Sequence, residues 1–190
     1  YQLVQDNQQA LLSYQGGDLD VITISGDQVD QVSADPEFFT YNAGYLWYLT
    51  VNMQDVPELA NLNLRLALAN AIDRETMMTN VVKDGSQAAY FNVPDGLAVG
   101  PDGQDFRATA EDYSDVISYD PEKAQEYLEK AKAELGVNSF EFDMIVDDDA
   151  QPQQVATYLQ EQIQSTLPDV KISITIEPKK QRVLDCQSGD

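Results

Sequence analysis

The chain reads NLNLRLALANAIDRE from Asn61 to Glu75, and this stretch says more about the fold than any other. Four apolar side chains recur there with the spacing of one helix face: Leu64, Leu68, Ala71 and Ile72. Asp73 then stands where an N-cap belongs, so a second helix is predicted from 74 to 83, with Gly85 ending it. Two helices in close succession are therefore expected at this point.

Downstream of this stretch, helical and strand-like apolar patterns alternate. Asp120 followed by Pro121 is a strong helix start, because Asp accepts main-chain N–H bonds and proline at the first helical position loses no hydrogen bond. Strands and helices in alternation predict an α/β lobe with a mixed sheet flanked by helices. The predicted helices cover 121–135, 151–167 and 178–187, and the predicted strands cover 140–146 and 170–176.

The first half of the chain has weaker patterns. Helices are predicted for 6–15 and 26–32, and the segment 86–118, rich in proline and glycine, is predicted to be irregular. Aromatic and β-branched residues favour strands in three segments. These segments are 19–24, 38–41 and 45–52.

Composition excludes several classes of function. The 190 residues include 33 Asp and Glu against 11 Lys and Arg, a net charge of −22 that disfavours nucleic acid as a partner. The chain has no histidine and one cysteine, Cys186, so neither a thiolate-rich metal site nor an internal disulfide can form. We expect no cofactor and no metal, and no apolar run is long enough to span a membrane.

Alternation along the predicted strand 45–52 divides its side chains between two faces. Tyr48 and Thr50 lie on the more polar face, which makes them candidates for a ligand cleft, where an aromatic ring offers apolar area together with a hydroxyl. Packing of the aromatic residues into a core is the alternative interpretation. Both interpretations remain open on the sequence alone.

Two alternatives to a binding protein come from the acidic residues. Asp18 with Asp20, and the run Asp147 to Asp149, could supply the carboxylates of a hydrolase. The acidic run lacks the glycine turn and spaced ligands of a calcium loop, and it also suits a helix start. An acidic scaffold or adhesion domain is the second alternative.

Three segments, in order along the chain, resemble the bacterial extracellular solute-binding proteins of family 5, which serve peptide, dipeptide and nickel importers. They are GDLDV at 17–21, the stretch at 61–75, and YDPEKA at 119–124 with its helix ending AELG at 136. The resemblance is strongest to the C-terminal lobe of oligopeptide-binding proteins and implies a type II periplasmic-binding-protein fold. We expect residues 1–190 to form a single lobe of a longer, two-lobed protein, because the chain has no initiator Met and stops where the family continues.

The resemblance also implies a function and site residues. It implies a non-enzymatic, monomeric component of an ATP-binding cassette importer that captures peptides, passes them to a membrane permease, and is extracellular or periplasmic and lipid-anchored. By position in the family, Asn52 ends a strand beside the ligand, and Asp147 and Asp148 end another. Arg65 and Asp73 are expected to be structural, with Arg65 in a surface ion pair and Asp73 as a cap.

Overall fold

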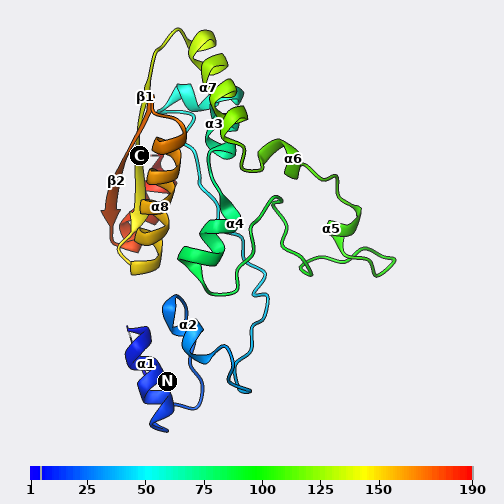
Figure 1. The fold of residues 1–190 in the computed structure, drawn as a ribbon, viewed down its shortest axis with the longest axis vertical. Helices are drawn as coiled ribbons and strands as arrows, with labels where there is room; N and C mark the ends of the chain where they lie inside the picture. Colours follow the sequence, from blue (N-terminus) through cyan, green and yellow to red (C-terminus); the bar gives the residue numbers. More distant parts are fainter. Residues whose placement is uncertain (5, 190) are drawn as a thin grey trace. The chain divides into compact units, whose positions relative to one another are not determined.

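The computed structural model describes residues 1–4 and 6–189. The chain forms two compact units, one made of Tyr1–Ala43 with Glu75–Ala88 and the other of Gly44–Arg74 with Ala89–Asp190 (Figure 1). Each unit is therefore built from two separate stretches of sequence. That both units belong to one lobe stays a prediction.

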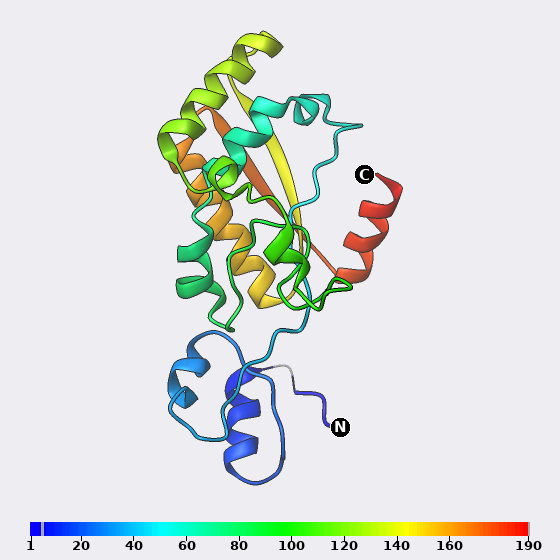
Figure 2. The same ribbon diagram turned by 90° about the vertical axis from the view of Figure 1, so that its right-hand side faces the viewer.

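A parallel pair of strands organises the second unit. β1 (Phe140–Asp147) pairs with β2 (Val170–Glu177) in a register that places Phe140 opposite Val170. Parallel neighbours need a long crossover, and α8 (Ala150–Thr166) supplies it, lying against both strands (Figures 1 and 2). Both strands and this helix were predicted and are confirmed. The antiparallel part of the predicted mixed sheet is not found, since β1 and β2 are the only strands of the described residues.

The even-numbered strand residues form the buried side of this sheet. Phe140, Val170 and Ile172 are buried there, together with the α8 residues Ala156, Leu159 and Ile163. Asp147 lies on the opposite face, because side chains alternate along a strand. That face carries α9 (Lys179–Ser188), whose Arg182 side chain binds Asp147.

Helices α3 (Leu62–Asn70) and α7 (Pro121–Leu135) pack closely against each other. Small alanines let the two backbones approach, and the residues buried in the two helices include Leu64, Ala67, Ala124, Leu128 and Ala131. The predicted caps are present on α7, where the Asp120 carboxylate accepts from Lys123 N at 3.0 Å and Gly136 takes a left-handed conformation. The sequence signals at both ends of this helix are therefore confirmed.

The first unit holds α1 (Asn7–Gln15) and α2 (Asp27–Val32), close to their predicted bounds. The helix predicted for 74–83 differs from expectation. It begins as α4 (Arg74–Met77), continues as the π-helical turn η2 (Met78–Val82) and stops at Lys83, which is left-handed at φ 47°. Lys83 therefore replaces Gly85 as the residue that ends it.

The strands predicted for 19–24, 38–41 and 45–52 are wrong for the described structure. Their residues are not paired with any strand in the part of the chain that the structure describes. A strand satisfies its main-chain groups through a neighbour, so aromatic and β-branched composition alone does not make one.

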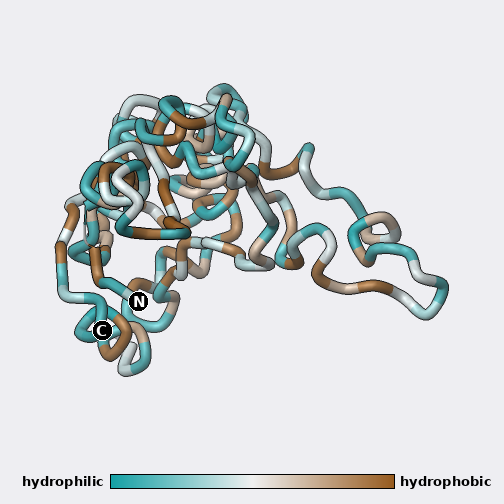
Figure 3. The backbone as a smooth tube through the Cα atoms, turned by 90° about the horizontal axis from the view of Figure 1, so that it is seen from below, coloured by the Kyte–Doolittle hydropathy of each residue, from teal (hydrophilic) through white to brown (hydrophobic). Residues whose placement is uncertain are grey.

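The segment 86–118 is largely irregular, as predicted. It contains only the short helices α5 (Phe106–Thr109) and α6 (Ser114–Ile117), and the 3-10 turn η1 (Pro57–Ala60) precedes α3 elsewhere in the same unit. Apolar and polar stretches alternate along the backbone tube in Figure 3. Within the described residues, no helix has both the length and the apolar character needed to cross a bilayer.

Candidate functional site

Asn52 joins two distant parts of the second unit. Its side-chain oxygen accepts from the main-chain N–H groups of Gln54 and Asp55, each at 3.1 Å. Its amide nitrogen donates to the Asp55 carboxylate at 2.9 Å and to the main-chain carbonyl of Gly189 at 2.6 Å. Asn52 therefore ends the extended segment 45–51 and fixes it to the residue that follows α9.

The side chains of this extended segment are open to solvent. Trp47 is 80% exposed, Tyr48 is 76% exposed, and Thr50 is exposed as well. The interpretation that these aromatic residues fill a core is therefore wrong for the described structure. The predicted division into two faces is also absent, because neighbouring residues on both supposed faces are exposed. Tyr48 and Thr50 are thus placed where a ligand could reach them.

Asp147 is buried, at 5% exposure, and lies at the carboxyl end of β1. Its carboxylate accepts a hydrogen bond of 2.5 Å from Arg182 Nε in α9, and this ion pair raises the pKa of the Arg182 guanidinium. A buried carboxylate needs such a partner to remain charged. Because the Asp147 carboxylate is already paired with Arg182, a ligand at this position would contact the ion pair rather than a free carboxylate.

Asp148 is exposed and follows directly in the loop before α8. Its main-chain carbonyl accepts from the side chain of Gln153 at 2.9 Å, and Asp149 is the N-cap residue of α8. The helix-start interpretation of the acidic run is therefore consistent with the structure. The carboxylate of Asp148 makes no hydrogen bond or ion pair with the described residues and is available at the surface.

Helix α9 relates the two groups of predicted site residues. Arg182, near its start, holds Asp147, and Gly189, just past its end, is held by Asn52. The helical rise between Arg182 and Gly189 spans roughly 10 Å. Asn52 and Asp147 are thus bound near the two ends of one helix, rather than in a single cluster.

Sequence reasoning missed two of these contacts. Arg182 lies in a predicted helix without a motif of its own, and only its position as one of few cations in an acidic chain could have marked it as a partner for a carboxylate. The Gly189 carbonyl is a main-chain group, so no residue type could have revealed its role. Both are now part of the candidate site.

Further acidic side chains surround the base of α9. Hydrogen bonding to Asp185 raises the pKa of Glu177, and Asp143 adds to the effect. Gln181 donates to the Asp185 carboxylate at 2.7 Å. This side of the sheet is thus acidic and suits an ammonium group of a ligand. No group of three or more metal-ligating side chains occurs among the residues the structure describes.

Two residues of the 61–75 stretch hold main-chain carbonyls. Arg65 donates to Leu59 O at 2.7 Å, so the predicted surface ion pair is wrong, and the described residues offer it no carboxylate within range. Arg74 donates to the carbonyls of Ala69 at 3.2 Å and Ile117 at 2.8 Å, and burial lowers its pKa. Both arginines therefore fasten connecting segments to α3.

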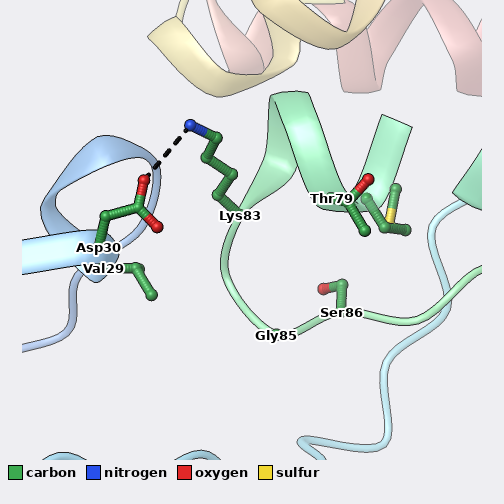
Figure 4. A pocket seen from close by; sticks show the side chains of 7 residues that line it. Val29, Asp30, Thr79, Lys83, Gly85 and Ser86 are labelled. Atoms are coloured by element: carbon green, nitrogen blue, oxygen red, sulfur yellow. Dashed lines mark ion pairs between the residues drawn. The ribbon is translucent and has the colours of Figure 1, made fainter. Parts of the chain in front are cut away.

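The first unit has a shallow pocket of its own, of about 280 Å³ (Figure 4). Lys83 points toward α2 there and pairs with Asp27 at 2.8 Å and Asp30 at 3.6 Å. None of the predicted site residues lines it. Asp18 and Asp20, the carboxylates of the hydrolase alternative, are exposed in this unit and do not line it either.

Comparison with known proteins gives a consistent result. The sequence profile of the bacterial extracellular solute-binding proteins, family 5 Middle, matches residues 1–190. A dipeptide-binding protein of Lactococcus lactis subsp. cremoris is 34% identical over 134 residues, which cover 70% of this chain and 24% of that protein.

Solved structures agree with this match. The pheromone receptor PrgZ, whose structure describes its mode of peptide binding, superimposes with a TM-score of 0.82 at 27% identity and covers 98% of this chain and 36% of its own. Listeria monocytogenes OppA bound to peptide gives a TM-score of 0.79 at 25% identity over 98% of this chain and 37% of that one. The predicted type II periplasmic-binding-protein fold is confirmed. The chain spans about a quarter of its curated relative and little more than a third of these structures.

Proposed function

We propose, on the premise that this chain belongs to the bacterial extracellular solute-binding proteins of family 5, that the protein captures short peptides and delivers them to the membrane permease of an ATP-binding cassette importer. The relatives support this, since one is named a dipeptide-binding protein and two solved neighbours are described with bound peptide. The structural observation that carries the proposal is the exposed segment 45–51, fixed at its end by Asn52 to the residue that follows α9.

The exposed side chains suit a peptide. Tyr48 offers an aromatic face and a hydroxyl, and Thr50 offers a second hydroxyl, so both can contact peptide without preference for one side chain. The exposed carboxylate of Asp148 can attract the peptide's ammonium group. Asn52 and Asp147 act differently, because their polar atoms are already engaged within the protein. We assign them to positioning the segment and Arg182, respectively.

The mechanism is non-catalytic. A peptide that contacts two lobes only in their closed arrangement shifts the equilibrium toward closure by the difference in its affinity for the two states. The permease then receives the closed form. We further propose that the protein works as a monomer outside the cytoplasmic membrane, held there by a lipid anchor, with no nucleic acid or cofactor involved.

Native mass spectrometry of the full-length protein, purified without refolding, tests the proposal. Additional masses that disappear on denaturation and fragment as short peptides are the expected result. Titration calorimetry then compares Tyr48→Ala with the matched control Tyr113→Ala, an exposed tyrosine of the irregular segment. We expect peptide affinity to fall about tenfold in the first variant only, a change of about 1.4 kcal/mol. Equal affinity in both variants would remove Tyr48 from the site.

The hydrolase alternative is tested with the same preparation. Peptides incubated with the protein are expected to be recovered intact. We expect the same result for each of four single variants, in which Asp18, Asp20, Asp147 or Asp148 is replaced. Cleavage that disappears in one of these variants would replace our proposal with the carboxylate-based hydrolase. If no peptide, sugar or metal chelate raises the melting temperature of the protein, the acidic scaffold is favoured instead.

A further inference from the structure

Three aspartates of the chain are each followed directly by a glycine. The pairs are Asp84–Gly85, Asp95–Gly96 and Asp102–Gly103. In such a pair the main-chain nitrogen of the glycine can attack the side chain of the aspartate, because glycine has no Cβ atom to hinder the approach. The hydrogen bonds of the three glycines decide which nitrogen is able to react.

Two of the glycine N–H groups are held by hydrogen bonds. The Gly96 N–H donates to the Asp105 carboxylate at 2.6 Å, and the Gly103 N–H donates to the main-chain carbonyl of Gly100 at 2.9 Å. Each of these bonds must break before the nitrogen can attack the preceding side chain. At these two positions the reaction therefore requires a local opening of the structure.

The N–H group of Gly85 is not held in this way. Within residues 1–4 and 6–189 it donates no hydrogen bond. Asp84 and Gly85 are both exposed, in the turn that follows Lys83 (Figure 4). The attacking nitrogen is therefore available without any opening of the structure.

Asp102 provides a matched comparison for Asp84 within the same protein. The Asp84 carboxylate accepts from the main-chain N–H of Ser86 at 2.9 Å, and the Asp102 carboxylate accepts from that of Gln104 at 3.1 Å. Both aspartates are exposed, and the glycines that follow them are left-handed, at φ 86° and φ 77°. The hydrogen bond of the glycine N–H is the difference between the two turns that bears on the reaction.

We propose that Asp84–Gly85 is a site of spontaneous isoaspartate formation in this protein, and that the fold protects the other two pairs. The Gly85 nitrogen attacks Cγ of the protonated Asp84 carboxyl, so an N–Cγ bond forms, the Cγ–OH bond breaks, and the amide hydrogen leaves with the hydroxyl as water. Water then opens the resulting succinimide ring at the main-chain carbonyl of Asp84. The product has the same atoms as the original chain, but its main chain passes through the Asp84 side chain and is one carbon longer.

The added carbon lies directly after a strained residue. Lys83 is left-handed at φ 47°, ends η2, lines the pocket of the first unit and pairs with Asp27 at 2.8 Å. A residue other than glycine keeps this conformation only where its surroundings impose it. The modification therefore changes the connection that holds Lys83 in place.

Ageing of the full-length protein tests the proposal. The protein is incubated at mildly acidic pH in water enriched in heavy oxygen, so each succinimide that hydrolyses leaves one heavy oxygen atom in the chain. Cleavage after glutamate in ordinary water then releases residues 76–111 as one peptide that carries all three pairs. Electron-transfer fragmentation locates the label and the isoaspartate. We expect both at Asp84, with at least about tenfold less at Asp95 and Asp102.

The isolated peptide 76–111 is the control for intrinsic reactivity. All three pairs are expected to react at similar rates there, because no fold holds the glycine N–H groups. In the full-length variant Asp84→Glu the longer side chain must close a six-membered ring, so we expect no label at this position.

Three results would overturn the proposal. The first is equal labelling of Asp84 and Asp102 in the folded protein, and the second is labelling of Asp84 in the peptide but not in the protein. The third is an equally strong preference for Asp84 in the peptide, since the local sequence rather than the fold would then be the cause.

Discussion

Asn52 donates a 2.6 Å hydrogen bond to the main-chain carbonyl of Gly189, a residue 137 positions later in the chain. The same side chain closes the turn at Gln54 and Asp55. One asparagine thus sets where the extended segment 45–51 ends and where the chain leaves α9. This contact joins the part of the molecule that offers aromatic side chains to the part that carries the Asp147–Arg182 pair.

Replacing Asn52 by alanine tests the importance of this contact. The variant loses one hydrogen bond with Gln54, two with Asp55 and one with Gly189, each worth about 0.5 kcal/mol at these solvent-accessible sites, so we expect the free energy of unfolding to fall by about 2 kcal/mol. Urea denaturation of the full-length protein measures it. The matched control is Asn63→Ala, which loses one exposed hydrogen bond to Glu134 and should cost less than about 0.5 kcal/mol. Equal effects would mean that Asn52 has no special role.

Removing Arg182 should have a larger effect than removing any surface cation. Arg182→Ala leaves the Asp147 carboxylate buried without its partner, and we expect a loss of about 2 to 4 kcal/mol of stability. The double variant Asp147→Asn with Arg182→Ala should regain part of it, because the uncompensated charge is gone. Thermal unfolding of the four proteins completes the cycle. Additive effects of the two substitutions would show that the pair is not coupled.

Much of the second unit could be predicted from its sequence. The helix α7 has its signals within its own residues, an N-cap at Asp120 and a left-handed glycine at 136, and β1 and β2 have continuous apolar alternation. The three wrong strands had suitable residues but no partner among the described residues, and pairing is a property of two segments. Local patterns cannot supply it.

The candidate site could be predicted only in part. Asn52 and Asp147 were identified by the family resemblance, at the ends of two segments, and the structure shows that Asp147 binds Arg182 of α9 and Asn52 binds the Gly189 carbonyl just past it. Arg182 and the Gly189 carbonyl were missed, since contacts across long sequence separations depend on how the elements pack. The exposure of Tyr48 could not be predicted either, because aromatic residues occur both in cores and in ligand clefts.

Asp120 is expected to make stability depend on acid pH. Its bond from the main-chain N–H of Lys123 lowers the pKa of the carboxyl below its ordinary value of 3.8. A carboxyl with a lowered folded pKa stabilises the protein above its unfolded pKa, and this contribution disappears as pH falls through the folded value. The variant Asp120→Asn keeps an N-cap oxygen but cannot titrate. We expect its stability to decrease less than that of the native protein as the pH falls below about 4, as measured by thermal melting.

Glu177 is expected to have the opposite effect on the pH dependence of stability. Hydrogen bonding to Asp185 raises its folded pKa above 4.5, so it stabilises at pH values below its unfolded pKa and loses that effect as pH rises through the folded one. Glu177→Gln should therefore gain stability relative to the native protein as pH rises through the folded pKa of Glu177. Thermal melts of both variants from pH 3 to 7 distinguish the two groups, and identical profiles would contradict both assignments.

Net charge leads to a prediction about salt. At −22 over 190 residues the chain repels itself, and this repulsion opposes the compact state. Raising the ionic strength from about 0.01 to 0.5 M shortens the Debye length from about 30 Å to less than 10 Å, so we expect the melting temperature to rise by several degrees. Sodium chloride and potassium chloride should act equally, because screening does not distinguish the cations. If only calcium, at millimolar concentration, raised the melting temperature, specific binding would be the cause. A fall in melting temperature with sodium chloride would show that attractive ion pairs, such as Lys132 with Asp169, outweigh the repulsion.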